Sequence, residues 1–258
     1  MDKKLKDHFL VLWNKYFDDA ELPITFYYTD DEGHVDLVKP GTGHRCVIGQ
    51  LAKVRVGESL RFNVDSIGCP GGKRYLGFTD KIRPEFEHFL SYGIPGKMEG
   101  ERYKKSPELV RQTMATMPVL KAPGRFIVFK RWDTLEESDT PEVVIFFARP
   151  DVLSGLFTLA SFDVADPTGV IAPFGAGCGS IVQHPYLQKD ASSPKAVLGM
   201  FDPSARHCVP EDTLTFAVPM NRFTTMVNNA EESFLITGTW DKIRNRIAGK
   251  GNSQESGS

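Results

Sequence analysis

The chain has 258 residues, of which 41% are hydrophobic and 25% charged, and its formal net charge is −2 at pH 7. This is the composition of an ordinary soluble globular protein, and the small net charge speaks against a general nucleic-acid or membrane-surface binder. No apolar run approaches the ~18 residues of a membrane span, and the run at residues 9–13 is too short for a signal peptide. We therefore expect a cytoplasmic protein.

The first third of the chain predicts helices and strands in alternation. Residues 3–20 have the apolar spacing of an amphipathic helix, and residues 24–30 are β-branched and aromatic, as in a strand. Cys46 is expected at the start of a second helix that ends at Gly57, after a loop over residues 31–43. A half-buried strand over residues 59–66 follows, and the Cys-Pro-Gly-Gly segment at 69–72 reads as a tight turn.

The rest of the chain predicts three strands and five helices. The most apolar strand pattern covers residues 141–151 and is expected at the centre of a sheet, with Asp151 capping the next helix. Low complexity predicts a disordered tail over residues 249–258. The other predicted elements are strands at 124–132 and 212–219 and helices at 84–92, 106–117, 151–162, 220–229 and 240–247.

This order of elements predicts one α/β domain over residues 1–248, with α+β as the alternative, built on a mixed sheet with helices on its faces. Residues 20–125 and 126–235 also share an order of motifs that suggests an internal duplication with pseudo-two-fold halves. The strand ITFYYTD is paired with VVIFFARPD, the helix after Cys46 with the segment after Cys178, and RYLGF with AVLGMF. The alternative is a chance similarity of short apolar strings.

The candidate chemistry centres on the chain's four cysteines, Cys46, Cys69, Cys178 and Cys208. In a reducing cytoplasm, thiols are more often free, reactive or metal-bound than paired. A CxxC pair, the usual mark of a zinc site, does not occur in the sequence. A scattered set can still bind a metal or cluster if the fold brings it together. The alternative is that the cysteines are buried apolar residues.

Glycines and arginines near the cysteines extend the candidate site. Amides next to Gly71, Gly72, Gly177 and Gly179 can approach a sulfur or an anion closely. The side chains of Arg45 and Arg206 could hold an anion. The glycine turns could instead bind a phosphate, and Cys178 near His184, or Cys208 beside His207, could be a nucleophile.

Several of these segments together resemble the domain-of-unknown-function family 169, an uncharacterised archaeal and bacterial family. The resemblance rests on RCVIGQLA around Cys46, CPGGKRYLGF at Cys69, the single-cysteine block at Cys178, LGMFDPSAR and TFAVPMNRF. It implies that Cys46, Cys69 and Cys178 recur in the family, and it implies no activity. It leaves the fourth ligand open between Cys208, Asp202 and a position free for a substrate.

The sequence thus leads to one leading hypothesis and two alternatives. The leading hypothesis is a cysteine-ligated metal-binding protein holding an iron–sulfur cluster, with Cys46, Cys69, Cys178 and Cys208 as ligands. Such a protein would take a redox partner or a small-molecule substrate. The first alternative is a metal-free protein that binds an anionic small molecule through the glycine loops and Arg206. The second is a thiol-dependent enzyme.

Overall fold

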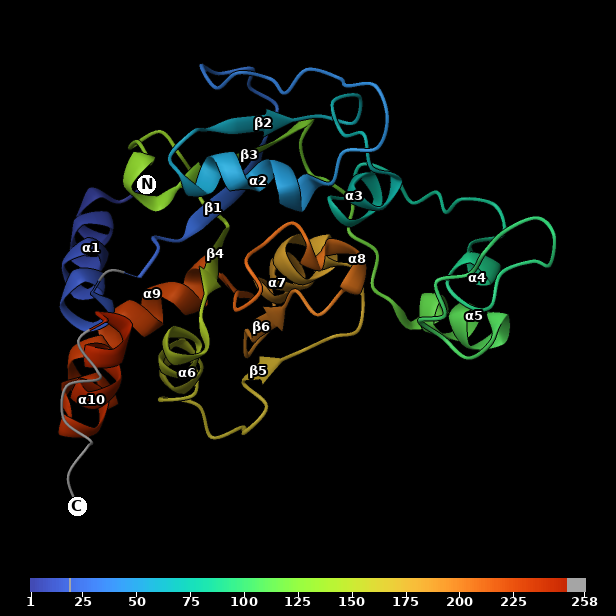
Figure 1. Cartoon of the computed structure of the whole chain (residues 1–258). Coiled ribbons are helices and arrows are strands. Elements are labelled where there is room, and N and C mark those ends of the chain that lie inside the picture. The colour runs from blue at the N-terminus through green and yellow to red at the C-terminus, as the bar shows by residue number, and fades with distance from the viewer. Residues whose placement is uncertain (19, 250–258) are drawn as a thin grey trace.

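The computed structural model describes residues 1–18 and 20–249, so the predicted disordered tail lies, apart from Gly249, outside the described residues. Its centre is a seven-stranded sheet in the order β2-β3-β1-β4-β7-β6-β5 (Figure 1). The strands are β1 (Ile24–Thr29), β2 (Leu60–Phe62), β3 (Phe126–Arg131), β4 (Val143–Ala148), β5 (Val170–Ile171), β6 (Ala196–Gly199) and β7 (Leu214–Pro219). All neighbouring strands are antiparallel except β5 and β6, which are parallel. The predicted α/β class with a mixed sheet is confirmed.

Strand β4 shows why the sheet is covered on both faces. All six of its residues are buried, and they alternate between two separate hydrophobic clusters. Val143, Ile145 and Phe147 belong to one cluster, because residues two apart along a strand point to the same face. The predicted central position of this most apolar strand is confirmed.

One face of the sheet, called here the cysteine face, carries α2, α3, α7, α8 and the π-helix η2. Buried residues of these segments share one cluster with Ile24 and Phe26 of β1 and with Cys178. Helix α2 contributes the predicted stripe, Val47, Ile48, Leu51 and Val54. The segments are α2 (Val47–Arg55), α3 (Pro70–Tyr75), η2 (Gly179–Gln183), α7 (His184–Gln188) and α8 (Pro203–Arg206).

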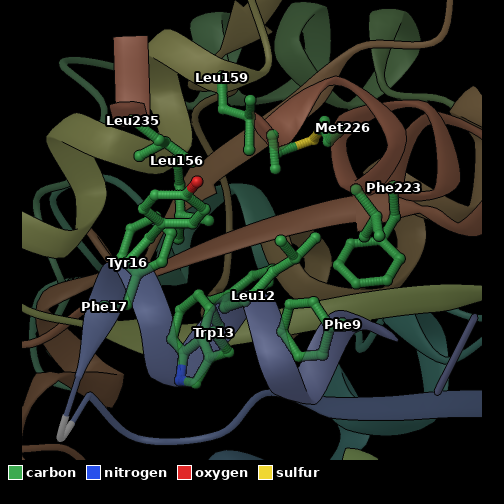
Figure 2. A pocket seen from close by; sticks show the side chains of 13 residues that line it. Phe9, Leu12, Trp13, Tyr16, Phe17, Leu156, Leu159, Phe223, Met226 and Leu235 are labelled. Atoms are coloured by element: carbon green, nitrogen blue, oxygen red, sulfur yellow. The ribbon is translucent and has the colours of Figure 1, made fainter. Parts of the chain in front are cut away.

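The opposite face is covered by α1 (Lys3–Phe17), α6 (Pro150–Leu159), α9 (Met220–Asn229) and α10 (Gly238–Ile247). Helices α1, α6 and α9 contribute most of the walls of a cavity of about 30 Å³ that is lined mainly by apolar and aromatic side chains (Figure 2). The buried Tyr16 hydroxyl, on this face, has no hydrogen-bond partner among the described residues. The cavity holds little more than one water molecule, so it is a packing void and not a ligand site.

A long excursion separates α3 from β3 and stands to one side of the sheet (Figure 1). It contains α4 (Phe86–Phe89) and α5 (Pro107–Thr116), which begins as predicted at the Ser106 cap and Pro107. In the part of the chain that the structure describes, no helix is long and apolar enough to cross a membrane.

Three local predictions are wrong. The Cys-Pro-Gly-Gly segment is not a tight turn but the first turn of α3, because Cys69 caps the helix and Pro70 takes its first position. For the same reason Pro150 starts α6, so its cap is Arg149 and not Asp151. Strand β2 is limited to Leu60–Phe62, shorter than the predicted strand.

The strand order is the same in both halves when it is read outward from the central pair. The first half gives β1-β3-β2 and the second gives β4-β7-β6, with β5 added at the edge. Two of the three motif pairings fit this order, namely β1 with β4, and the segments after Cys46 and Cys178. The pairing of RYLGF with AVLGMF is wrong, because the first ends helix α3 and the second is strand β6. The duplication therefore stays a hypothesis.

Candidate functional site

Cys46 lies where the loop from β1 enters helix α2 on the cysteine face. It is the cap residue of α2, with an extended backbone, and its thiol makes no capping hydrogen bond. Its partly buried side chain packs against the core of the cysteine face. The predicted position at a helix start is confirmed, and the thiol remains available to partners other than its own helix.

Cys69 caps α3, the short helix that follows β2. Its Sγ accepts a hydrogen bond from the Gly72 N–H at 3.3 Å, and the Gly71 N–H also lowers the pKa of this thiol. A Cβ on Gly72 would lie 2.8 Å from Val47 Cγ2, so glycine lets α3 pack directly against the first turn of α2. This contact brings the two cysteine-bearing helix starts together.

Cys178 immediately precedes the π-helix η2, which continues into α7. The side chain is only 6% exposed. Gly179 follows it, and a Cβ there would lie 3.1 Å from the Tyr75 ring of α3, so this glycine allows η2 to approach α3. Single π-turns are frequently found at functional sites.

Asp202 is the cap residue of α8 and completes a set of four groups at helix starts. Its Oδ1 accepts hydrogen bonds from the Ser204 N–H at 3.0 Å and the Ser204 hydroxyl at 2.7 Å, and its Oδ2 accepts one from the Gly177 N–H at 3.1 Å. The carboxylate therefore ties α8 to the segment that carries Cys178. The Gly177 N–H thus donates to Asp202 rather than to a cysteine sulfur.

The backbone before Asp202 is strained. Met200 has φ +67°, a left-handed conformation that costs a non-glycine residue ~1–3 kcal/mol, and its side chain is fully buried. A Cβ on Gly177 would lie 3.1 Å from Met200 Sδ, so the side chain packs closely beside the Cys178 segment. The strained turn at Met200 thus lies two residues before Asp202, where β6 gives way to α8.

Electrostatic interactions indicate that these groups lie within range of one another. Burial raises the pKa of the Cys178 thiol well above its ordinary value, and Cys46, Cys69 and Asp202 raise it further. Burial also raises the pKa of Cys69, to which Cys46 and Asp202 add. Thiols that are far apart in the sequence are therefore neighbours in the fold.

Cys208 lies just beyond α8, on the side of Cys46. Burial raises its pKa to about 11, and the neighbouring Cys46 thiol and the charge of Asp202 contribute. His207 Nε2 is 3.5 Å from its sulfur. A Cβ on Gly49 of α2 would lie 3.5 Å from the same sulfur, so Cys208 packs against that helix.

The two predicted arginines have other surroundings. The Arg206 guanidinium donates hydrogen bonds to the carbonyls of Thr213, Pro210 and Glu211, so it holds the loop before β7 instead of facing the cysteines. Arg45 is exposed, and its guanidinium lies against Gly41 in the loop before α2.

Two tyrosines that the sequence did not single out border the site. Burial raises the pKa of Tyr75, to which Cys178 and Asp202 contribute. Tyr103, from the excursion between α3 and β3, forms a hydrogen bond with Ser204, next to Asp202. Reading Cys69-Pro70 as a helix start would have placed Tyr75 on a helix of the site, whereas no sequence signal points to Tyr103.

The arrangement is a cluster of neighbouring thiols rather than a finished ligand shell. Among residues 1–18 and 20–249, no three His, Cys, Asp or Glu side chains stand together as a ready-made metal site. A metal would require the thiols to lose their protons and turn toward one another, because thiolates and not thiols are ligands. The Gly71 and Gly72 N–H groups are already placed to stabilise a thiolate at Cys69.

The fold is that of an α/β protein with a mixed sheet, and the candidate cysteine site lies on one face of that sheet. The model of the domain-of-unknown-function family 169, described as "Uncharacterised ArCR", matches residues 15–229. The chain belongs to this family. No curated protein and no solved structure matches it.

Proposed function

We propose that the protein binds an iron–sulfur cluster through Cys46, Cys69 and Cys178, as the redox or substrate-activating centre of the molecule. The observation that carries the proposal is that Cys46 and Cys69 add to the raised pKa of Cys178, and Cys46 to that of Cys69, although the three thiols come from three separate helical segments. Cysteines that only fill an apolar core are not expected to lie near one another. Soft thiolate sets select iron–sulfur clusters, zinc or Cu(I).

The position of the cysteines at helix N-termini favours a negatively charged, thiolate-ligated centre. Cys46 stands at the start of the nine-residue helix α2, where the helix dipole and free N–H groups stabilise negative charge. Hydrogen bonds from backbone amides to sulfur, like those at Cys69, tune the potential of thiolate-held clusters. The raised thiol pKa values of the metal-free site would fall when a cation binds, because a bound metal reverses the local electrostatics.

We assign the fourth position to Asp202 and not to Cys208. Asp202 contributes to the raised pKa of Cys69, Cys178 and Cys208 alike, so its carboxylate lies within electrostatic range of all three. Cys208 interacts with Cys46. A carboxylate is a harder ligand than a thiolate, so it would leave one metal ion open to exchange with a small substrate.

Anaerobic purification tests the proposal. The wild-type protein should be brown and contain iron together with acid-labile sulfide. Cys69→Ser should lose both, and because serine is a strong helix cap it should keep α3 folded. Cys208→Ser is the matched control and should retain the cluster. Colourless, metal-free wild-type protein from the same preparation would contradict the proposal.

A second candidate function, thiol–disulfide exchange, is favoured by the proximity of Cys46 to Cys208. In this reaction one thiolate attacks a partner's disulfide, and the second thiol displaces the reduced partner as an internal disulfide forms. The pKa of about 11 at Cys208 works against it, since little thiolate forms there at neutral pH. A disulfide between Cys46 and Cys208 after treatment with oxidised glutathione, in metal-free protein, would support this candidate.

A further inference from the structure

A second concave site lies beside the cysteines and has a different chemistry. It is a pocket of about 500 Å³, a volume typical of small-molecule sites, and its lining is drawn from three loops. The first loop contributes Gly41 and Gly43. The other lining residues of the loops are Asp65, Ile67, Gly68, Thr79, Lys81, Ile82 and Arg83. Pro70 and Lys73 of α3 complete the lining.

The charge of the lining is strongly one-sided. Lys73, Lys81 and Arg83 are positive, and Asp65 is the negative residue of the lining. Neither lysine forms an ion pair with any described residue. The Arg83 guanidinium stacks over the Phe89 ring, 4.1 Å from its centroid, and pairs with no described carboxylate. Three cations without counterions around one cavity are a site for a polyanion.

The geometry of the loops keeps these cations in place. Lys81 follows a turn in which its N–H donates to Thr79 Oγ1 at 3.1 Å. The Arg74 guanidinium donates to the Asp80 carbonyl at 2.5 Å, which ties this loop to α3. The Arg45 guanidinium lies against Gly41 and adds a fourth positive charge at the edge of the pocket. These contacts fix the backbone of the loop that carries Lys81 relative to α3, which carries Lys73.

Glycine lets the walls come close enough to form the cavity. A Cβ on Gly68 would lie 3.1 Å from the Gly43 carbonyl oxygen and 3.4 Å from the Arg45 nitrogen. The two wall segments therefore touch backbone to backbone, and they lead directly into Cys46 and Cys69. Backbone close to the cavity leaves peptide groups available to an oxyanion.

From this geometry we propose that the pocket binds a small phosphorylated molecule, with Lys73, Lys81 and Arg83 on its phosphate oxygens. Lysine ammonium groups and an arginine fork are the usual partners of phosphate, and a diphosphate-sized anion matches three cations opposed by one carboxylate. The inference does not depend on the metal, since no cysteine lines the pocket. If both sites operate, the segments that carry Cys46 and Cys69 join them.

Inorganic pyrophosphate is the probe, and calorimetric titration of the full chain at fixed ionic strength measures its binding. Wild type should bind it, and Lys73→Gln with Lys81→Gln should weaken binding by about tenfold for each lysine removed. The matched control, Lys15→Gln with Lys53→Gln, removes two exposed lysines outside the pocket and should bind like wild type. Asp65→Asn should tighten binding roughly two- to fivefold, because it removes the opposing charge.

Three outcomes would overturn the inference: no pyrophosphate binding at millimolar concentrations, equal weakening in the pocket and control variants, or tighter binding of citrate than of pyrophosphate. The last would make the ligand a polycarboxylate. The same titration on Cys69→Ser separates this inference from the proposed function. Binding that persists in that variant supports the pocket whether or not the wild-type protein holds iron.

Discussion

The two halves of the site can be compared element by element, and they differ in one decisive residue. In each half, a central strand leads to a cysteine that precedes a helical segment, Cys46 in the first half and Cys178 in the second. An outer strand then leads to a short helix with proline at its first position. That helix is capped by Cys69 in the first half and by Asp202 in the second.

This comparison explains why three cysteines and an aspartate from separate segments all lie on the cysteine face. The strand orders β1-β3-β2 and β4-β7-β6 place corresponding helix starts on the same face of the sheet. The second half uses a π-helix where the first uses α2, and the first half carries the α4–α5 excursion where the second has a short loop. The difference between thiolate and carboxylate makes the proposed centre chemically asymmetric.

The largest expected effect comes from removing either of the corresponding cysteines. Cys46→Ala and Cys178→Ala should each lower the affinity for iron by at least about tenfold, because losing a ligand costs more than losing one of its hydrogen-bond partners. Iron and sulfide content after anaerobic purification is the measurement. Retention of full iron by either variant would show that the two halves do not share one centre.

Replacing the carboxylate by a thiol sharpens the comparison. Asp202→Cys should give the second half the cap residue of the first and close the ligand set with four thiolates. Iron should then be lost to a chelator more slowly than from wild type. Asp202→Asn is the control, because asparagine caps a helix as well as aspartate does and supplies no anionic ligand. If iron is lost to the chelator at the wild-type rate in both variants, Asp202 is not the fourth ligand.

The close contact between α3 and α2 is testable through stability. Gly72→Ala places a methyl group 2.8 Å from Val47 Cγ2 and 3.1 Å from Ile67 Cγ2, so it should lower the free energy of unfolding by roughly 1–3 kcal/mol. Gly238→Ala is the control, because a Cβ there meets nothing within 4 Å and the residue begins helix α10. Urea unfolding of both variants would measure the difference. Equal stability would mean that the helices are less closely packed than described.

The smallest expected effect concerns a pair of arginines. Arg74 of α3 and Arg206 of α8 each donate to carbonyls of the loop that follows the helix. Arg74→Gln and Arg206→Gln should each lower stability by about 1 kcal/mol, the usual net worth of a lost hydrogen bond, and leave iron content unchanged. Chemical unfolding and metal analysis of the same samples measure both quantities. If Arg206→Gln loses iron and Arg74→Gln does not, Arg206 is part of the cluster site.

Much of the fold could be predicted from local patterns. The apolar run of β4, the stripe of α2 and the span of α9 follow directly from residue periodicity. The start of α3 was missed because two glycines cost a helix ~1 kcal/mol each relative to alanine, and this cost suggested a turn. Packing of Gly72 against Val47 outweighs that cost, and no local pattern reveals it.

The candidate site was predictable only in part. Glycine-rich cysteine segments indicated which thiols to examine, and Cys46 and Cys69 both lie within electrostatic range of Cys178. Arg206 was predicted near the cysteines because it is close to Cys208 in the sequence. Sequence proximity does not reveal that its guanidinium donates to the Thr213 carbonyl. The role of Asp202 depends on strand order, a long-range property that short motifs do not contain.

Anomalous diffraction at the iron absorption edge, from crystals grown of anaerobically purified protein, tests the central claim most directly. Our account predicts an iron peak bonded to the sulfur atoms of Cys46, Cys69 and Cys178, with the Asp202 carboxylate on the remaining side. Crystals without an iron peak among these three sulfur atoms would contradict it.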